Sequence, residues 1–179
     1  MTFRAVVTTT WGEWRREHPA TTVLSLDTGF DRDYAEGAAY RDYFATDRLM
    51  FEVPTTDTRL RNKDEVLVLR SEVLGVTVPP TAIAVARLRR NPVFAFEAGG
   101  RPLVAITSKA GANAVYERGA HTFAARSADG SVSDAHGGRW TVAADALVGP
   151  GGERLARVAA HRAFWFGWVA QYPDTVLIQ

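Results

Sequence analysis

Residues 165–178 read Trp-Phe-Gly-Trp-Val-Ala-Gln-Tyr-Pro-Asp-Thr-Val-Leu-Ile, and their pattern of two tryptophans, a proline, a threonine and apolar residues recurs near the N-terminus. Four residues match at a constant offset: Trp11, Trp14, Pro19 and Thr21 against Trp165, Trp168, Pro173 and Thr175. Tryptophans at i and i+3 share one face of a short helix, the proline ends that helix, and Thr-Val-Leu opens a strand. The pattern predicts a helix-then-strand unit used twice.

Paired indoles at helical spacing are typical core anchors, because each removes a large apolar area from water. We therefore expect both tryptophan pairs to be largely buried, and removal of residues 1–26 to destabilise the domain. Stacking of the indoles on a ligand stays open as an alternative.

The middle of the chain is rich in short β-prone runs. Strands are expected at 66–69, 73–78, 93–97, 103–106, 114–117, 121–126 and 140–142, and a short helix at 81–89 after Pro79-Pro80. Gly99-Gly100 between two of these runs is a strong hairpin signal. The sequence predicts an α+β domain with a mainly antiparallel, barrel-like β-sheet and a few short helices.

The whole chain of 179 residues has the size of one domain. Residues 1–26 form the first helix–strand unit, which is repeated at 162–179, and residues 64–160 form a β-rich body. Between them, residues 27–63 carry six aromatic side chains in an acidic stretch: Phe30, Tyr34, Tyr40, Tyr43, Phe44 and Phe51. So many aromatic residues indicate an ordered, loop-rich excursion that packs onto the body.

Composition argues against several partners and chemistries. With 21 basic and 20 acidic residues the net charge is +1, which gives no general attraction to nucleic acid or to an anionic membrane. No apolar run reaches the roughly 20 residues that span a bilayer, and no signal peptide is expected. The chain has no cysteine, which excludes disulfides, thiolate metal sites and cysteine nucleophiles.

Several motifs together resemble a known family. These are Thr9 to Pro19, Val23 to Tyr34, Gly99 to Val104, and His161-Arg162-Ala163-Phe164-Trp165-Phe166-Gly167-Trp168. They resemble the bacterial and archaeal Domain of Unknown Function 3179 family over nearly the whole chain. The resemblance implies a fold relationship and supplies no activity.

Longer members of that family have two related halves, so the resemblance implies a second-half-like unit preceded by the closing helix of a first half. Family members often carry Cys-Pro-x-Cys-Gly after the strand that resembles Pro102 to Ile106. This chain reads Thr-Ser-Lys-Ala-Gly-Ala at 107–112 instead. Thiol chemistry of the family is therefore not expected here.

The recognisable site motifs are missing. The acidic group Asp27, Asp31, Asp33 and Glu36 has the wrong spacing for a calcium loop, and the four histidines form no ligand pair of metal-binding spacing. No nucleophile elbow or phosphate-binding glycine loop is present. We therefore assign no cofactor and no metal from the sequence.

Five residues are candidate ligand-binding groups, because each places a polar group beside apolar segments: His161, Asp134, Arg118, Arg32 and Tyr34. Simple pairing of Arg118 and Asp134 with neighbours at a sheet edge is the alternative. The leading hypothesis is a non-catalytic binding or structural module, paired as a homodimer or with a sister domain. The other hypothesis is an enzyme or metal-binding protein whose dispersed polar site forms near His161, Asp134 and Arg118. No nucleic-acid partner is expected.

Overall fold

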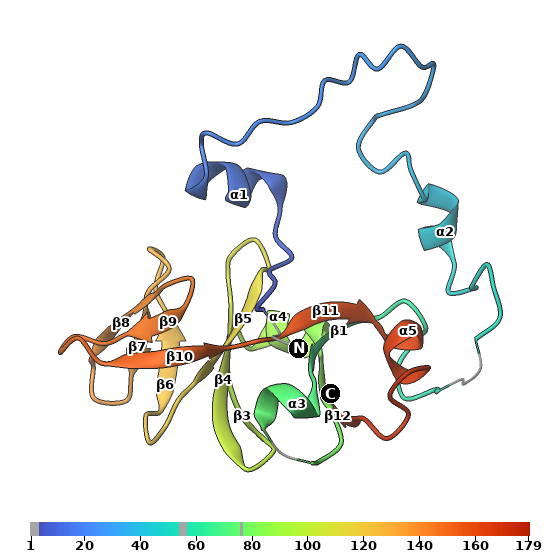
Figure 1. The fold of residues 1–179 in the computed structure, drawn as a ribbon. Coiled ribbons are helices and arrows are strands. Elements are labelled where there is room, and N and C mark those ends of the chain that lie inside the picture. The colour runs from blue at the N-terminus through green and yellow to red at the C-terminus, as the bar shows by residue number, and fades with distance from the viewer. Residues whose placement is uncertain (1–3, 54–56, 76) are drawn as a thin grey trace.

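The computed structural model describes residues 4–53, 57–75 and 77–179, and it is an α+β fold with two sheets (Figure 1). The helices are α1 (Trp11–Glu17), α2 (Arg41–Ala45), α3 (Ser71–Leu74), α4 (Val85–Arg90) and α5 (Trp165–Val169). The smaller sheet has the order β11-β1-β2-β12, built from β11 (His161–Phe164), β1 (Glu65–Leu69), β2 (Thr81–Ala84) and β12 (Val176–Ile178).

The larger sheet has eight strands in the order β3-β4-β5-β10-β9-β8-β7-β6. They are β3 (Val93–Ala98), β4 (Arg101–Thr107), β5 (Asn113–Glu117), β6 (Phe123–Arg126), β7 (Val132–Asp134), β8 (Arg139–Val142), β9 (Ala146–Val148) and β10 (Arg154–Val158). All its ladders are antiparallel, and β6 curls round to approach β3, which makes the sheet nearly a closed barrel. The expected mainly antiparallel α+β fold is confirmed.

The turn between β3 and β4 shows why the hairpin could be recognised from sequence. Gly99 and Gly100 have φ of 59° and 72°, a left-handed conformation that glycine adopts without a Cβ clash. The six-residue register from Val93 opposite Ile106 to Ala98 opposite Arg101 follows from this turn.

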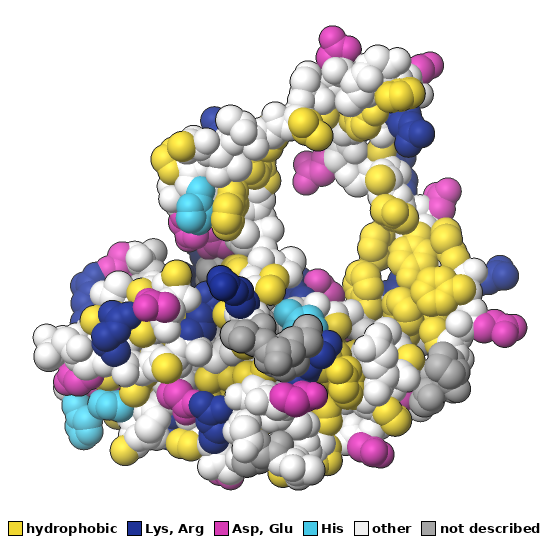
Figure 2. All heavy atoms as spheres, viewed as in Figure 1, with side chains coloured by type: hydrophobic (Ala, Val, Ile, Leu, Met, Phe, Trp, Pro, Cys, Tyr) yellow, Lys and Arg dark blue, Asp and Glu magenta, His cyan; other side chains and the backbone are white. Residues whose placement is uncertain are grey.

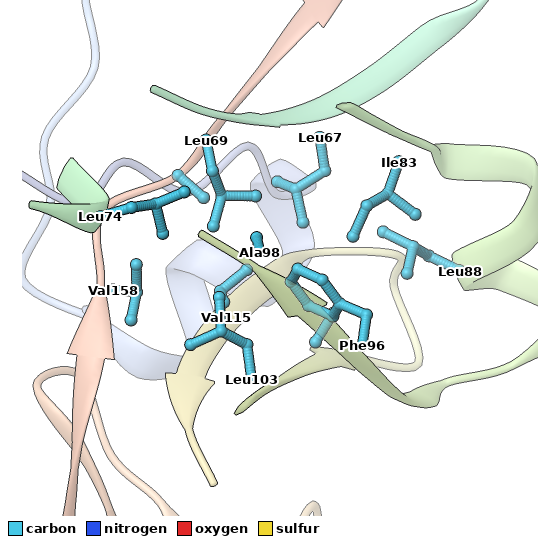
Figure 3. Packing of buried hydrophobic residues seen from close by; sticks show 12 residues of the cluster. Leu67, Leu69, Leu74, Ile83, Leu88, Phe96, Ala98, Leu103, Val115 and Val158 are labelled. Atoms are coloured by element: carbon cyan, nitrogen blue, oxygen red, sulfur yellow. The ribbon is translucent and has the colours of Figure 1, made fainter. Parts of the chain in front are cut away.

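The core lies between the two sheets. Leu67 and Leu69 point from β1 toward Phe96 of β3 and Val115 of β5 (Figure 3), and all four side chains are buried. Strand β1 has four fully buried residues in a row, because the larger sheet covers one of its faces and α5 covers the other. A central strand that is covered on both faces has a continuous apolar sequence.

Three elements differ from the expected ones. No strand follows α1, because residues 21–26 pair with no strand of either sheet. The segment expected as a helix at 81–89 is split, because 81–84 form β2, which is buried between β1 and β12, and only Val85–Arg90 are helical. Strand pairing there overrides the helix preference of alanine. The strand expected at 73–78 is instead the end of helix α3, which Gly75 closes at φ 71°; residue 76 lies outside the described residues.

The N-terminal arm, which we define as residues 4–53, leaves the body and arches from α1 to α2 above it (Figure 1). Trp165 and Trp168 are 0% and 4% exposed, as expected, but Trp11 and Trp14 are 47% and 41% exposed. The expectation that both pairs are buried is therefore wrong for the first pair. The reason is tertiary, because α5 lies on the smaller sheet whereas α1 contains no buried residue.

The aromatic excursion contacts the body at one end only. Phe44 and Phe51 approach Phe164 and Phe166, with ring centroids 5.9 and 5.7 Å apart, and hydrophobic side chains gather between α2 and α5 (Figure 2). Residues 27–37 are exposed, and Phe30 there packs on no core residue.

Candidate functional site

A cavity of about 530 Å³ lies between α1 and the face of the larger sheet. Ligand pockets in proteins have volumes of about 300 to 1,000 Å³, so this one can hold a small molecule. The arm contributes Val7, Thr9, Glu13, Trp14, Glu17 and His18. The body contributes Ile106, Ser108, Ala112, Asn113, Ala114, Tyr116, Arg126, Asp129, Gly130, Ser131, Arg139, Thr141, Val142, Ala143, Ala144 and Arg157.

Helix α1 is held over the cavity through Glu13. The Ser108 hydroxyl donates to Glu13 Oε2 at 3.0 Å, and the Thr9 hydroxyl donates to the same oxygen. The helix itself begins at a threonine cap, where Thr10 Oγ1 accepts the Glu13 amide at 3.2 Å. One carboxylate therefore joins the helix start to the loop after β4.

Tyr116 fixes the floor of the cavity. Its hydroxyl donates to the Ala143 carbonyl at 2.8 Å, which ties β5 to the loop between β8 and β9. Burial raises the pKa of Tyr116 above its usual value, because the phenolate is disfavoured away from water. The phenol therefore stays protonated and serves as a hydrogen-bond donor.

Three arginines face the cavity from the sheet. Arg139 forms an ion pair with Asp129, and Arg157 donates from Nη1 to the Ala144 carbonyl at 2.8 Å. Arg126 has no hydrogen-bond or ion-pair partner within the described part of the chain. The buried Nε atoms of Arg126 and Arg157 both lack an acceptor there. The sheet side is therefore positively charged.

Asp134, a sequence candidate, closes the turn between β7 and β8. Its carboxylate accepts the Trp140 indole Nε1–H at 2.9 Å and the backbone amides of Gly138 and His136 at 2.8 and 2.9 Å. The indole hydrogen bond is the main reason that the pKa of Asp134 is lowered, with the two amides adding to it. These three hydrogen bonds give Asp134 a structural role in the turn.

Arg118 lies close to the same region. It donates from Nη1 to the His121 carbonyl at 3.1 Å, and the His121 ring lies 4.7 Å from Trp140. Arg118 and Asp134 are thus linked through His121 and Trp140, although no direct bond between them is present among the described residues. Local hydrogen bonds account for Asp134, whereas Arg118 is bonded through Nη1 and its buried Nε has no acceptor among the described residues.

The other three candidates lie elsewhere. His161 is in β11 of the smaller sheet, with its ring 5.9 Å from Trp168, and burial, together with the charge of Arg70, lowers its pKa. Arg32 and Tyr34 are exposed in the arm, where the Tyr34 hydroxyl is 2.8 Å from Thr28 Oγ1. Within the part described, no contact joins His161 to Asp134 or Arg118.

Sequence reasoning missed the residues that line the cavity, including Glu13, Glu17, Arg126 and Arg157. They come from α1, β6 and β10, which are far apart in sequence, and none belongs to a motif of known chemistry. Only the folded chain brings them together. Across residues 4–53, 57–75 and 77–179, no three acidic or histidine side chains are placed to hold a metal ion. None of the helices in those ranges has the length and apolar character to cross a membrane.

Comparison with known proteins agrees with the motifs. No curated protein and no solved structure gives a significant match to the chain. One family model, described as protein of unknown function (DUF3179), matches residues 1–175, which is nearly the whole sequence. The chain therefore belongs to this family of proteins of unknown function.

Proposed function

We propose that this chain is a non-catalytic binding module whose N-terminal arm takes a second copy of the chain as its partner. The distribution of exposed apolar side chains carries the proposal. Fifteen large hydrophobic side chains are exposed among the described residues, and thirteen of them lie between Val6 and Phe51. Exposed apolar groups concentrated on one segment mark an interaction surface.

The exposed area supports a partner of considerable size. A compact monomer of this mass, 19.6 kDa, exposes about 8,600 Å². This chain exposes 11402 Å², about a third more than that. A stable dimer buries about 800 Å² on each partner, which is less than this excess.

The arm is also locally ordered in the way that α5 is. The Trp14 indole donates to Thr21 Oγ1 at 3.0 Å, and the Trp168 indole donates to Thr175 Oγ1 at 2.9 Å. Each indole stacks on the ring four residues later, at 4.0 Å for His18 and 4.3 Å for Tyr172.

After α5 the chain continues as β12, which pairs with β2, but the equivalent residues Val23 and Leu24 have no strand partner. Leu24 is 93% exposed. The N-terminal segment therefore has the internal contacts of α5 and its following turn but leaves its apolar side chains uncovered, which supports docking on another protein surface.

A second copy is the simplest partner for this arm. The net charge of +1 gives two copies little electrostatic reason to stay apart. The arm stands away from the body and leaves an opening beneath its arch (Figure 2), so a second chain can pack against its exposed apolar side chains while α1 stays over its own cavity. In a two-fold symmetric dimer each of these contacts forms twice.

The test is the oligomeric state of the full chain, measured by light scattering at micromolar concentration. We expect a dimer for the wild type. The double variant Val23→Ser/Leu24→Ser should have a dimer dissociation constant at least about tenfold higher, because burial of each side chain is lost in both copies.

Val78→Ser is the matched control, since Val78 is an exposed valine on the body, and it should dimerise like the wild type. A monomeric wild type, or equal dimerisation of both variants, would contradict the proposal.

The other hypothesis, an enzyme or metal protein based on His161, Asp134 and Arg118, has less support. Asp134 already accepts three hydrogen bonds within its own turn, from Trp140, Gly138 and His136. His161 lies in the other sheet. None of the three residues lines the cavity beneath α1.

A further inference from the structure

The cavity beneath α1 has two walls of opposite charge. Its sheet wall carries Arg126, Arg139 and Arg157, of which Arg139 is paired with Asp129. Its helix wall carries Glu13 and Glu17. The remaining charge is therefore positive on the sheet side and negative on the helix side.

No ion pair joins these walls within the described part of the chain. Glu13 is held by Ser108 and Thr9, and Glu17 has no side-chain partner there. Arg126 has none either. Opposite charges that face a shared cavity without meeting leave both signs available to a ligand that lies between them.

The arginines are suited to a carboxylate. Arg157 is oriented by its bond to the Ala144 carbonyl, and its Nε, like that of Arg126, lacks an acceptor. Buried donor groups without acceptors are uncommon in folded proteins, so each calls for an explanation. A carboxylate at the two guanidinium groups gives them charge-assisted hydrogen bonds, with a small rotation of either side chain.

Besides its charged residues, the cavity is lined by apolar side chains, among them Trp14 from α1 and Ile106, Ala114 and Val142 from the sheet. Its lining also contains polar residues, which are Thr9, Ser108, Asn113, Ser131 and Thr141. A ligand that carries charges of both signs and an apolar group would match all three parts of the cavity. A polyanion such as a nucleotide is disfavoured, because Glu13 and Glu17 would repel it.

We propose that this cavity binds a small zwitterion of the α-amino acid class with an apolar side chain. Its carboxylate lies at Arg126 and Arg157, its ammonium group at Glu17, and its side chain against Ile106 and Val142. This goes beyond dimerisation through the arm and does not depend on it.

The first experiment titrates the full chain calorimetrically with L-phenylalanine and with two analogues that each keep one charge, phenylpropionate and phenethylamine. We expect phenylalanine to bind about tenfold more tightly than either analogue, since each lacks one charge-assisted contact. No binding of phenylalanine, or equal binding of the three compounds, would overturn the proposal.

The second experiment separates the walls. Arg126→Gln should lower the affinity for phenylalanine and for phenylpropionate about tenfold and leave the affinity for phenethylamine unchanged. Glu17→Gln should lower the affinity for phenylalanine and phenethylamine only. Arg90→Gln is the control, because Arg90 is exposed on α4 outside the cavity.

Circular dichroism checks the fold of each variant. If Arg126→Gln unfolds the chain, Arg157→Gln replaces it with the same expectation. If the Arg126→Gln and Glu17→Gln variants bind all three compounds as tightly as the Arg90→Gln control does, the charged walls do not hold the ligand.

Discussion

At the scale of single residues, the four paired tryptophans show how one residue type acquires opposite roles. Trp165 and Trp168 are packed against Val66, Val68 and Ala82, whereas Trp11 is exposed on a helix with no buried residue. The hydrogen bonds and ring contacts within each unit are alike. The contribution of each indole to the free energy of unfolding therefore depends on what covers it rather than on its own helix.

This difference predicts unequal effects of the same substitution. Trp168→Ala should lower the free energy of unfolding by about 3 to 5 kcal/mol, because it leaves a cavity against the smaller sheet. Trp14→Ala should lower it by about 0.5 kcal/mol, as is usual for exposed positions. Urea unfolding of the two variants, below the concentration at which any dimer forms, measures both values. Equal losses would mean that α1 is packed as firmly as α5.

At the scale of elements, short turns determine much of the larger sheet. The Asp134 carboxylate organises the turn from β7 to β8 by accepting two backbone amides and the Trp140 indole. Arg162 joins the two sheets, since its guanidinium donates to Asn113 Oδ1 at 2.7 and 2.9 Å and contacts Glu65. The partners of Asp134 are close to it in sequence, whereas Arg162 reaches residues 49 and 97 positions away.

Asp134 makes the stability of this turn depend on pH. Its pKa is lowered in the folded state, so its contribution is present above the ordinary carboxyl pKa and is lost as the pH falls through the lowered value. We expect Asp134→Asn to be less stable than the wild type at pH 7, with the difference shrinking as the pH falls below about 4.

Thermal unfolding as a function of pH measures this difference. Asp31→Asn is the control, because Asp31 is exposed in the arm and its substitution should leave the profile unchanged. A difference between Asp134→Asn and the wild type that stays constant with pH would contradict the assignment.

At the scale of the whole molecule, the body and the arm contribute differently to the hydrophobic core. The three hydrophobic clusters contain buried residues only from Val66 to Val169. The arm is tied to the body by Glu13 near its start. Near its end Phe44 contacts Phe164, Phe51 contacts Phe166, and Asp47 accepts hydrogen bonds from the backbone amides of residues 62 and 63. Because no buried core residue comes from α1, we expect the body to fold without it.

Removal of residues 1–26 should thus leave a folded chain, contrary to the expectation from the tryptophan repeat. We expect the thermal midpoint to fall by no more than about 4 °C, which corresponds to roughly 1 kcal/mol for a chain of this size. Removal of residues 165–179 should abolish cooperative unfolding, because it takes Trp165, Trp168 and β12 out of the smaller sheet. Calorimetry of both truncated chains tests the contrast, and a large loss from the first deletion would show that α1 is part of the core.

The sequence by itself determined the elements that depend on neighbours along the chain. Gly99-Gly100 predicted its hairpin, the run Val66 to Leu69 predicted a strand, and Trp-x-x-Trp before proline predicted both short helices. Local turn geometry and apolar periodicity are sufficient for these.

Only the tertiary structure decided what covers each element. It placed Thr81–Ala84 in a strand between β1 and β12, left Trp11 and Trp14 exposed, and assembled the cavity from α1 and distant strands. The physical reason is that burial and pairing depend on contacts between residues far apart in sequence, which neither residue type nor spacing encodes.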